Sequence, residues 1–507
     1  MNTFMNALKN ENNYTLTENG AITYPSTLNG LLDLFALGGA YRTRSDADCI
    51  NLFKKAFEEN ETYAMKCLFY LADIRGGQGE RRFFRVVTKW LAREHTEVMR
   101  RNLQYIPEYR RWDDLYEFVG TPLEKDAFKL IRDQLGLDVQ CKTPSLLAKW
   151  LKSENTSSLQ SRALANKTRA FLNMTHKEYR KTLSILRERI NILERLMSAG
   201  RWDEIEFDKI PSRAGMIYKN AFARHDIERM RQGAEQSYED FAKDKNTKVN
   251  TKALYPYEVV EKALNYRGNK LDDTDRLIIN KYWDGLTDVL NGYAFNGIAV
   301  VDVSGSMIGT PMNVAISLGM YCAERVTGPY ANHFFTFSNH PELVKVEGID
   351  FVDKVQRMTR ARWGMNTNVE AVFDKILRIA QENHLRQEEI PQNVIILSDM
   401  QFDSCACGNG NSTLSYQYYR RIDGPRADET LFETIEKRWN QAGYKMPLLT
   451  FWNLDARSDR AIPMRKSGHV QFVSGFSQNI FDSVMKGLGA EDLMFDKLDS
   501  ERYACIH

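Results

Sequence analysis

Apolar residues recur at three- and four-residue spacing from about residue 46 to residue 240, which is the period of an amphipathic helix. The stretch EYRKTLSILRERINILERLMSAG (178–200) is the clearest case. Its apolar stripe comprises Tyr179, Leu183, Leu186, Ile190, Leu193 and Met197, and Gly200 is a helix stop signal. The pattern therefore predicts many helices in series, stacked in pairs as in a HEAT-like α-solenoid or ring. This expectation rests on helix succession alone, because no strict sequence period is visible.

The pattern changes after residue 296. Short β-rich runs follow, GIAVVDVS, HFFTFSN, NVIILSDM, PLLTFWNL and HVQFVSGF, and helical segments separate most of them. Strands that are apolar on both faces and alternate with helices predict a parallel, doubly wound sheet. The expected fold class is therefore multidomain α plus α/β. Its parts are a polar, partly ordered arm (1–45), a helical domain (46–290) and an α/β domain (291–507).

Composition restricts the class of protein. The 507 residues are 43% hydrophobic and 27% charged, as in globular proteins, and no run of about 18 apolar residues predicts a membrane span. Seven cysteines fit free thiols in a reducing compartment, so we expect a cytoplasmic protein. The net charge of +2 divides into +6 for residues 1–290 and −4 for residues 291–507. This mild asymmetry permits a nucleic-acid surface on the helical half.

The run IAVVDVSGSM (298–307) ends a predicted strand in one carboxylate and two hydroxyls. Ligands of doubly wound sheets bind beyond the carboxyl ends of the strands, where Asp302, Ser304 and Ser306 would lie. Thr367, before a predicted helix, and Asp399, at the end of NVIILSDM, could add further oxygens. Carboxylate and hydroxyl oxygens suit Mg²⁺ or Mn²⁺. The alternative interpretation is a capped turn in which these side chains satisfy backbone groups.

These five residues match, in order and spacing, the metal-ion-dependent adhesion site of von Willebrand factor A domains. The resemblance implies that Asp302, Ser304, Ser306 and Thr367 ligate the cation directly or through water, and that Asp399 binds it through water. It also implies that one coordination position remains for water or for a partner's carboxylate.

Over nearly its whole length the chain resembles an uncharacterised TROVE-like family of plants, bacteria, phages and large DNA viruses, which is similar to the Ro autoantigen. The resemblance is carried by LFYLADIRGGQGERRFF (68–84), IPEYRRWDDL (106–115), LLAKWL (146–151), IPSRAG (210–215), LYPYEVV (254–260) and the adhesion-site residues. Arg110 or Arg111 stands where the family pattern has Gly, which puts a local turn in doubt. The resemblance implies a ring of helical repeats closed by an A domain, and binding of misfolded or small structured RNA.

Two basic stretches are candidates for RNA contacts. The first surrounds a Gly-rich bend and offers Arg75, Arg81, Arg82 and Arg85, with Phe83 and Phe84 able to stack on bases and glycine amides able to approach a phosphate. The second offers Arg162, Lys167, Arg169, Lys177, Arg180 and Lys181. The alternatives are a helix–helix turn with its phenylalanines in the core, and a solvated helix face.

No histidine stands at a motif spacing from a nucleophile, so we expect no enzymatic activity and no catalytic residues. The favoured hypothesis is a non-catalytic RNA-binding protein with a divalent-metal site. The alternative is a protein-interaction scaffold in which the metal captures a partner's Asp or Glu, without RNA binding. A third hypothesis is a phage or viral component.

Overall fold

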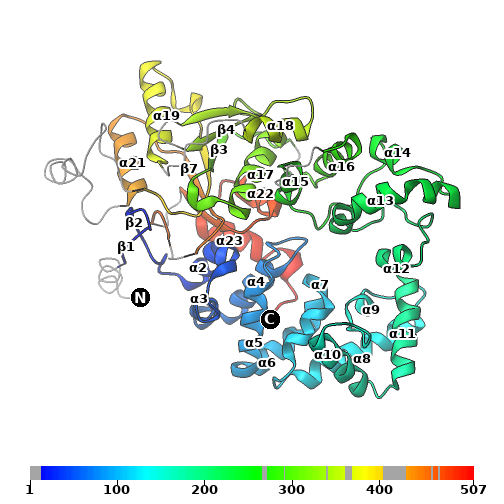
Figure 1. Ribbon diagram of the computed structural model, residues 1–507. Coiled ribbons are helices and arrows are strands. Elements are labelled where there is room, and N and C mark those ends of the chain that lie inside the picture. The colour runs from blue at the N-terminus through cyan, green and yellow to red at the C-terminus, as the bar shows by residue number, and fades with distance from the viewer. Residues whose placement is uncertain are drawn as a thin grey trace.

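The computed structural model describes residues 13–264, 271–290, 292–337, 341–359, 368–403, 430–457, 461–465 and 469–507. A helical part precedes an α/β domain built on a six-stranded sheet (Figure 1). This confirms a multidomain α plus α/β fold. None of the helices in these ranges is both long and apolar enough to cross a membrane.

The sheet has the strand order β5-β4-β3-β6-β7-β8. Its strands are β3 (Gly297–Asp302), β4 (His333–Phe337), β5 (Glu342–Lys345), β6 (Asn393–Ser398), β7 (Leu448–Asn453) and β8 (Val470–Ser474). Five strands run parallel as expected, but the edge strand β5 pairs antiparallel with β4, so the sheet is mixed. The connection from β4 to β5 is too short for the crossover that a parallel neighbour requires.

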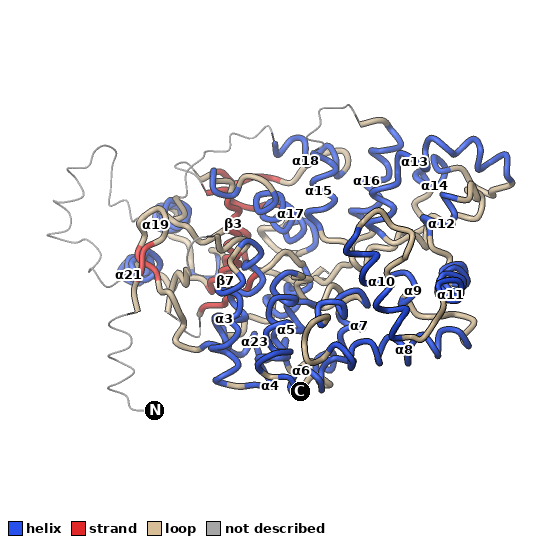
Figure 2. Tube along the Cα trace, turned by 60° about the horizontal axis from the view of Figure 1, so that its bottom comes forward, coloured by secondary structure: helices blue, strands red, loops and turns tan. Residues whose placement is uncertain are grey.

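Helices cover both faces of this sheet, as a doubly wound fold requires. They are α17 (Thr310–Arg325), α19 (Glu370–Glu382), α21 (Leu431–Gln441), α22 (Phe481–Val484) and α23 (Ala490–Leu498), while α18 (Phe351–Thr359) packs on α15 (Pro256–Leu264) and α16 (Asp273–Asp284) of the helical part. Adjacent residues of β7 show the two faces: Phe451 contacts Phe432 of α21, and Trp452 contacts Phe481 of α22. Consecutive residues of these strands are buried, and most are apolar, because neither face of the sheet meets solvent. In Figure 2 the strands lie among the helices of this domain.

The helical part runs from α2 to α16. Its helices are α2 (Gly30–Leu37), α3 (Asp46–Glu59), α4 (Glu61–Ala72), α5 (Arg82–Glu94), α6 (Thr96–Asn102), α7 (Ile106–Tyr109), α8 (Glu124–Gln140), α9 (Leu147–Trp150), α10 (Leu159–Phe171), α11 (His176–Arg189), α12 (Leu193–Ser198), α13 (Ser212–Gln232), α14 (Tyr238–Lys243), α15 (Pro256–Leu264) and α16 (Asp273–Asp284). Short 3₁₀ segments include η1 (Gly38–Thr43) and η3 (Trp112–Phe118). The stripe predicted over 178–200 is divided between α11 and α12, because Asn191 adopts a left-handed conformation (φ 48°).

The helices follow an arc that leaves the α/β domain at α2–α4 and returns to it at α15–α16 (Figure 1). At the returning joint, Arg276 pairs with Asp350 at 2.6 and 2.7 Å, and Trp283 Nε1 donates to Glu324 at 2.7 Å. Trp283 also stacks on Phe351 with ring centroids 4.1 Å apart. The helical part therefore contacts the α/β domain both where it begins and where it ends.

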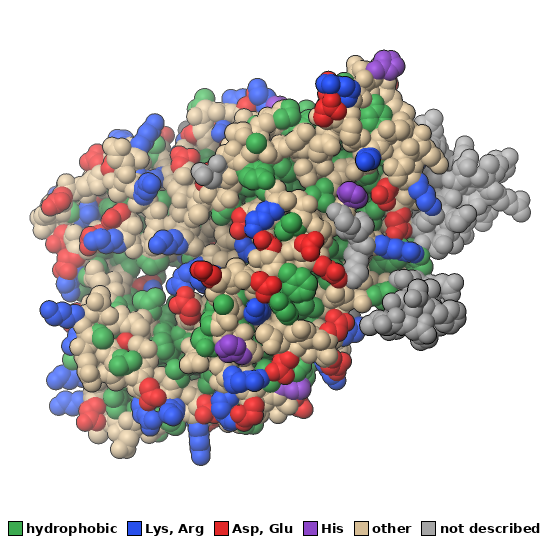
Figure 3. Space-filling view, turned by 180° about the vertical axis from the view of Figure 1, so that it is seen from behind, with side chains coloured by type: hydrophobic (Ala, Val, Ile, Leu, Met, Phe, Trp, Pro, Cys, Tyr) green, Lys and Arg blue, Asp and Glu red, His purple; other side chains and the backbone are tan. Residues whose placement is uncertain are grey.

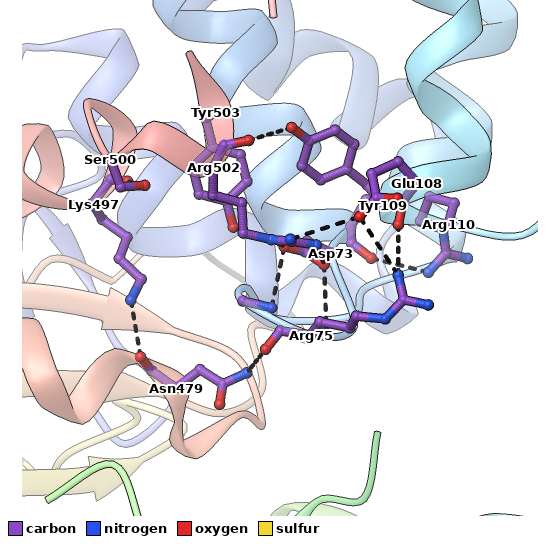
Figure 4. A network of polar contacts seen from close by, with 12 residues as sticks. Asp73, Arg75, Glu108, Tyr109, Arg110, Asn479, Lys497, Ser500, Arg502 and Tyr503 are labelled. Carbon is purple, nitrogen blue, oxygen red and sulfur yellow. Dashed lines mark hydrogen bonds and ion pairs between the residues drawn. The ribbon is translucent and has the colours of Figure 1, made fainter. Parts of the chain in front are cut away.

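The other joint is made by the C-terminus, which folds back onto the helical part. Arg502 makes a two-pronged pair with the fully buried Asp73, and one of its contacts measures 2.8 Å (Figure 4). Tyr503 Oη donates to the same carboxylate at 3.1 Å, and Tyr109 Oη donates to the backbone carbonyl of Arg502. Asn479 Nδ2 donates to the carbonyl of Arg75 at 2.8 Å. Asp73 therefore links the first helices to the last residues of the chain.

The polar composition of residues 1–45 predicts a partly ordered arm, but residues 13–45 are packed on the α/β domain. Two short strands, β1 (Thr15–Leu16) and β2 (Ile22–Thr23), precede α2, whose eight residues are all buried. Tyr24 and Ile462 exchange backbone hydrogen bonds of 3.0 and 2.8 Å. Ser474 Oγ at the end of β8 accepts from Gly39 N at 2.9 Å. The apolar run of α2 is buried between α3 and α4 of the helical part and β8 and α23 of the α/β domain.

Candidate functional site

Asp302 is the last residue of β3, at the carboxyl edge of the sheet. The parallel register pairs Val301 with Leu397 of β6, which brings Ser398 and Asp399 to the same edge. The chain then turns through η4 (Gly305–Met307), which places Ser304 and Ser306 beside this edge. Four of the five residues predicted to bind a metal are thus gathered from two strand ends. Thr367, the fifth, lies outside the described residues.

A hydrogen-bonded network connects these side chains. Ser398 Oγ donates to Asp302 Oδ2 at 2.5 Å, and Ser304 N donates to Asp302 Oδ1 at 2.9 Å. Ser304 Oγ and Ser306 Oγ are 3.1 Å apart, and the Ser306 hydroxyl bonds to Asp399. Ser398 was not among the residues expected from the sequence. Its position directly before Asp399, at the end of an apolar strand, is the signal that could have found it.

The two carboxylates share a site shielded from solvent. Asp302 is fully buried and Asp399 is 4% exposed. Burial, and then the neighbouring charge of Asp399, raises the pKa of Asp302 well above its ordinary range. Burial likewise raises the pKa of Asp399. A divalent cation would supply the positive charge that this arrangement lacks, so the donor set fits a hard cation.

The rest of this edge is partly closed by the N-terminal segment. Ala456, just after β7, donates its backbone N–H to the carbonyl of Ala40 in η1. Asp455, the residue before Ala456, pairs with Arg457. The negative charge of Asp455 also contributes to raising the pKa of Asp399. Ile308, beyond the serines, is 62% exposed and forms an open rim. Within the described ranges no three His, Cys, Asp or Glu side chains are arranged so that they could hold a metal, so a cation here needs the hydroxyls as ligands.

In the Gly-rich bend (residues 73–81) between α4 and α5, backbone amides donate hydrogen bonds to acceptors of the bend itself and of the end of α4. Asp73 accepts from the amides of Arg75 and Gly76, and the amides of residues 77–80 bond to carbonyls of residues 70, 71 and 73. A Cβ on Gly77 would come 1.8 Å from the Tyr70 carbonyl oxygen. Glycine is therefore required by close packing, and these amides are not available to cradle a phosphate.

The side chains around this bend serve mainly internal contacts. Phe83 and Phe84 are buried in the core and cannot stack on bases. Arg82 pairs with Asp46, Arg75 donates to the Glu108 carbonyl at 2.7 Å, and Arg85 pairs with Asp114 at 2.5 Å. Arg81 differs from these three, because its side chain has no hydrogen bond or ion pair among the described residues and its Nε is buried.

The second basic stretch occupies α10 and α11. Lys167 pairs with Glu124 at 2.7 Å, and Arg169 pairs with Glu154 at 3.0 Å. The remaining four, Arg162, Lys177, Arg180 and Lys181, are exposed and have no carboxylate partner within the described chain. Figure 3 shows Lys and Arg side chains mixed with Asp and Glu over the helical half. These four unpaired cations form what we call the α10–α11 surface.

A cavity of about 920 Å³ lies beside this surface. It is bounded by residues 149–156 and by parts of α11 and α12. Its lining includes five cations, Lys149, Lys152, Arg180, Arg187 and Arg195, and three carboxylates, Asp113, Glu154 and Glu194, so cations are in excess. Arg187 is committed to structure, since it donates to the carbonyls of Ala148 and Leu151 at 2.8 Å. The cavity is therefore cationic and open at one side to the α10–α11 surface.

Fold and site define a two-part protein, in which a helical arc closes on an α/β domain with two carboxylates and hydroxyls at the edge of its sheet. A model of the family Domain of unknown function (DUF2828) matches residues 17–133 and 137–292, and one of Domain of unknown function (DUF7788) matches residues 296–502. The chain belongs to the DUF2828 family.

Two individual proteins are similar to this chain. Uncharacterized protein L728 of Acanthamoeba polyphaga mimivirus is 32% identical over 511 residues, which cover 93% of this chain and 85% of that protein. The crystal structure of the Deinococcus radiodurans RO (RSR) protein aligns with a TM-score of 0.38 and 14% identity, over 94% of this chain and 100% of that one.

Proposed function

We propose that this protein is a non-catalytic RNA-binding protein of the Ro type, whose α/β domain is a von Willebrand factor A domain with a divalent cation. The observation that carries RNA binding is the α10–α11 surface, whose four cations have no carboxylate partner within the described chain. Unpaired Lys and Arg side chains gain most from phosphates, because no internal ion pair must be broken. The adjoining cationic cavity extends this surface.

The metal proposal rests on the buried pair Asp302 and Asp399, with Ser304 and Ser306 beside them. Two neighbouring carboxylates without a compensating cation destabilise a fold, and hard oxygen donors are what Mg²⁺ or Mn²⁺ requires. Asp302 and the serines would hold the ion, and Asp399 would act through water. Thr367 is proposed as a further ligand from the sequence motif alone. The exposed rim at Ile308 leaves room for a partner's carboxylate.

RNA binding is tested by purifying the protein from its native host and sequencing the nucleic acid that co-purifies at low and at high salt. We expect RNA at low salt and its loss at high salt, because phosphate contacts release counterions. Purification without RNA at low salt would refute the proposal.

The competing function is a metal-dependent protein scaffold that captures an acidic partner and binds no RNA. The open rim at the metal edge favours it as the second candidate. Pull-downs with wild type and Asp302→Ala, each with Mg²⁺ and with a chelator, separate the two functions. A protein partner that depends on both the metal and Asp302, recovered without RNA, would establish the scaffold instead.

A further inference from the structure

A cluster of cations and carboxylates lies where the Gly-rich bend meets the segment before η3. The cations are Arg81, Arg85, Arg110, Arg111 and Lys152, and the carboxylates are Asp113, Asp114 and Glu117. Five positive charges thus face three negative ones. This excess of positive charge is partly shielded from water, so its attraction for an anion is screened less than on an open surface.

The carboxylates of the cluster are already engaged. Asp114 accepts from Arg85 Nε at 2.6 Å on one oxygen and from Arg110 Nε at 3.1 Å on the other. Asp113 accepts from Arg111 through both oxygens, at 2.9 and 2.8 Å. The charge of Asp114 reaches Arg81, but both Asp114 oxygens already accept hydrogen bonds from Arg85 and Arg110.

Arg81 is consequently the cation that the cluster leaves unpaired. Its Nε is buried without a hydrogen-bond partner, and Arg110 Nη2 is a second buried donor in the same condition. The Arg110 side chain is only 3% exposed, so water reaches it poorly. Burial, and then the charges of Arg111 and Arg85, lowers the pKa of Arg81 to about 10. Two unsatisfied guanidinium donors in one place indicate a missing anion.

We propose that Arg81, with Arg110 and Arg111, binds an oxyanion of the phosphate class. A guanidinium presents parallel N–H donors that match two phosphate oxygens. Asp113 and Trp150, which both contact Arg111, line the cavity of about 920 Å³, so the cluster lies beside that cavity. Arg111 stacks on Trp150 at 4.0 Å, which fixes its position at the entrance. The site does not depend on RNA binding by the α10–α11 surface.

The experiment titrates the full-length protein with inorganic phosphate at constant ionic strength and follows binding by calorimetry. Arg81→Gln removes the charge, Arg81→Lys keeps it, and Arg93→Gln neutralises an exposed arginine of the same helix α5 as the matched control. We expect saturable binding by wild type, unchanged in Arg93→Gln, weakened at least about tenfold in Arg81→Gln and less in Arg81→Lys. Non-saturable binding, or equal effects of Arg81→Gln and Arg93→Gln, would overturn the site.

Two further titrations identify the source of the phosphate group, one with ATP and one with a single-stranded uridine 12-mer. If the site takes RNA phosphodiesters, Arg81→Gln weakens the 12-mer and free phosphate competes with it. If it takes a mononucleotide or free phosphate, Arg81→Gln weakens those ligands and spares the 12-mer. If the wild-type protein binds phosphate but not the 12-mer, the RNA proposal is refuted, whereas the proposal of an oxyanion site still stands. Circular dichroism of each variant excludes unfolding as the cause of any loss.

Discussion

Neutralising Lys177 and Lys181 together should weaken RNA binding by an amount that depends on salt. The α10–α11 surface has four cations without carboxylate partners in the described ranges, Arg162, Lys177, Arg180 and Lys181. Four phosphate contacts with single-stranded RNA give a slope of about −2.8 when the logarithm of the binding constant is plotted against the logarithm of the salt concentration. The affinity then falls about fifty-fold between about 50 and about 200 mM salt. Two remaining contacts in Lys177→Gln/Lys181→Gln give a slope of about −1.4, or about a seven-fold loss.

The assay is fluorescence polarisation with a labelled single-stranded RNA over a salt series. Lys125→Gln/Lys129→Gln is the matched control, because these exposed lysines have the same spacing on the neighbouring helix α8 and also lack an ion partner among described residues. The control should keep the slope of wild type. A slope that is equal in the two double variants would show that the α10–α11 surface does not contact phosphates.

Three further outcomes are expected. In urea denaturation, Arg502→Ala leaves the buried carboxylate of Asp73 without its ion partner and should lower the free energy of unfolding by about 3–5 kcal/mol. Arg386→Ala, which breaks an exposed pair, should leave the free energy of unfolding almost unchanged. Mg²⁺ or Mn²⁺ should raise the melting temperature of wild type and not of Asp302→Asn, and an equal rise in both proteins would argue against this site. Without divalent cations the folded protein binds protons at Asp302 and Asp399 more tightly than the unfolded chain, because the pKa of each is raised, so stability should fall as pH rises from about 4 through neutrality. Saturating Mg²⁺ should flatten this fall in thermal melts across pH, whereas a stability that increases over the same range without metal would contradict the raised values.

Elements could be predicted from sequence where the pattern of apolar residues matches the faces that the fold buries. The strand run of residues 297–301 is apolar up to Asp302 because both faces of the sheet are covered, and that pattern is visible in the sequence. The edge strand at 342–345 was not predicted as antiparallel, since its orientation follows from the short connection before it and not from its composition. The packing of residues 13–45, within the arm predicted over 1–45, depends in part on contacts with residues more than 400 positions later, which local patterns do not encode.

The candidate metal residues could be found from sequence because strand ends of a parallel sheet converge on one edge. Asp302 and Asp399 each follow an apolar run, and the fold places them together as expected. The RNA-contacting role of the basic residues could not be judged from sequence in the same way. The sequence identifies Arg75, Arg82 and Arg85 as cations, but only the structure shows that they bond to other groups of the same chain.

The division into a helical half and an α/β half, and the oxygen-rich strand end at Asp302, can be recognised in the amino-acid sequence. The pairing of Arg502 with Asp73, and the absence of a carboxylate partner for Arg81 among the described residues, become visible only in the folded chain. The difference lies in the range of the interactions. Hydrophobic period is a property of neighbouring residues, whereas ion pairing depends on which carboxylates the folded chain brings within about 4 Å.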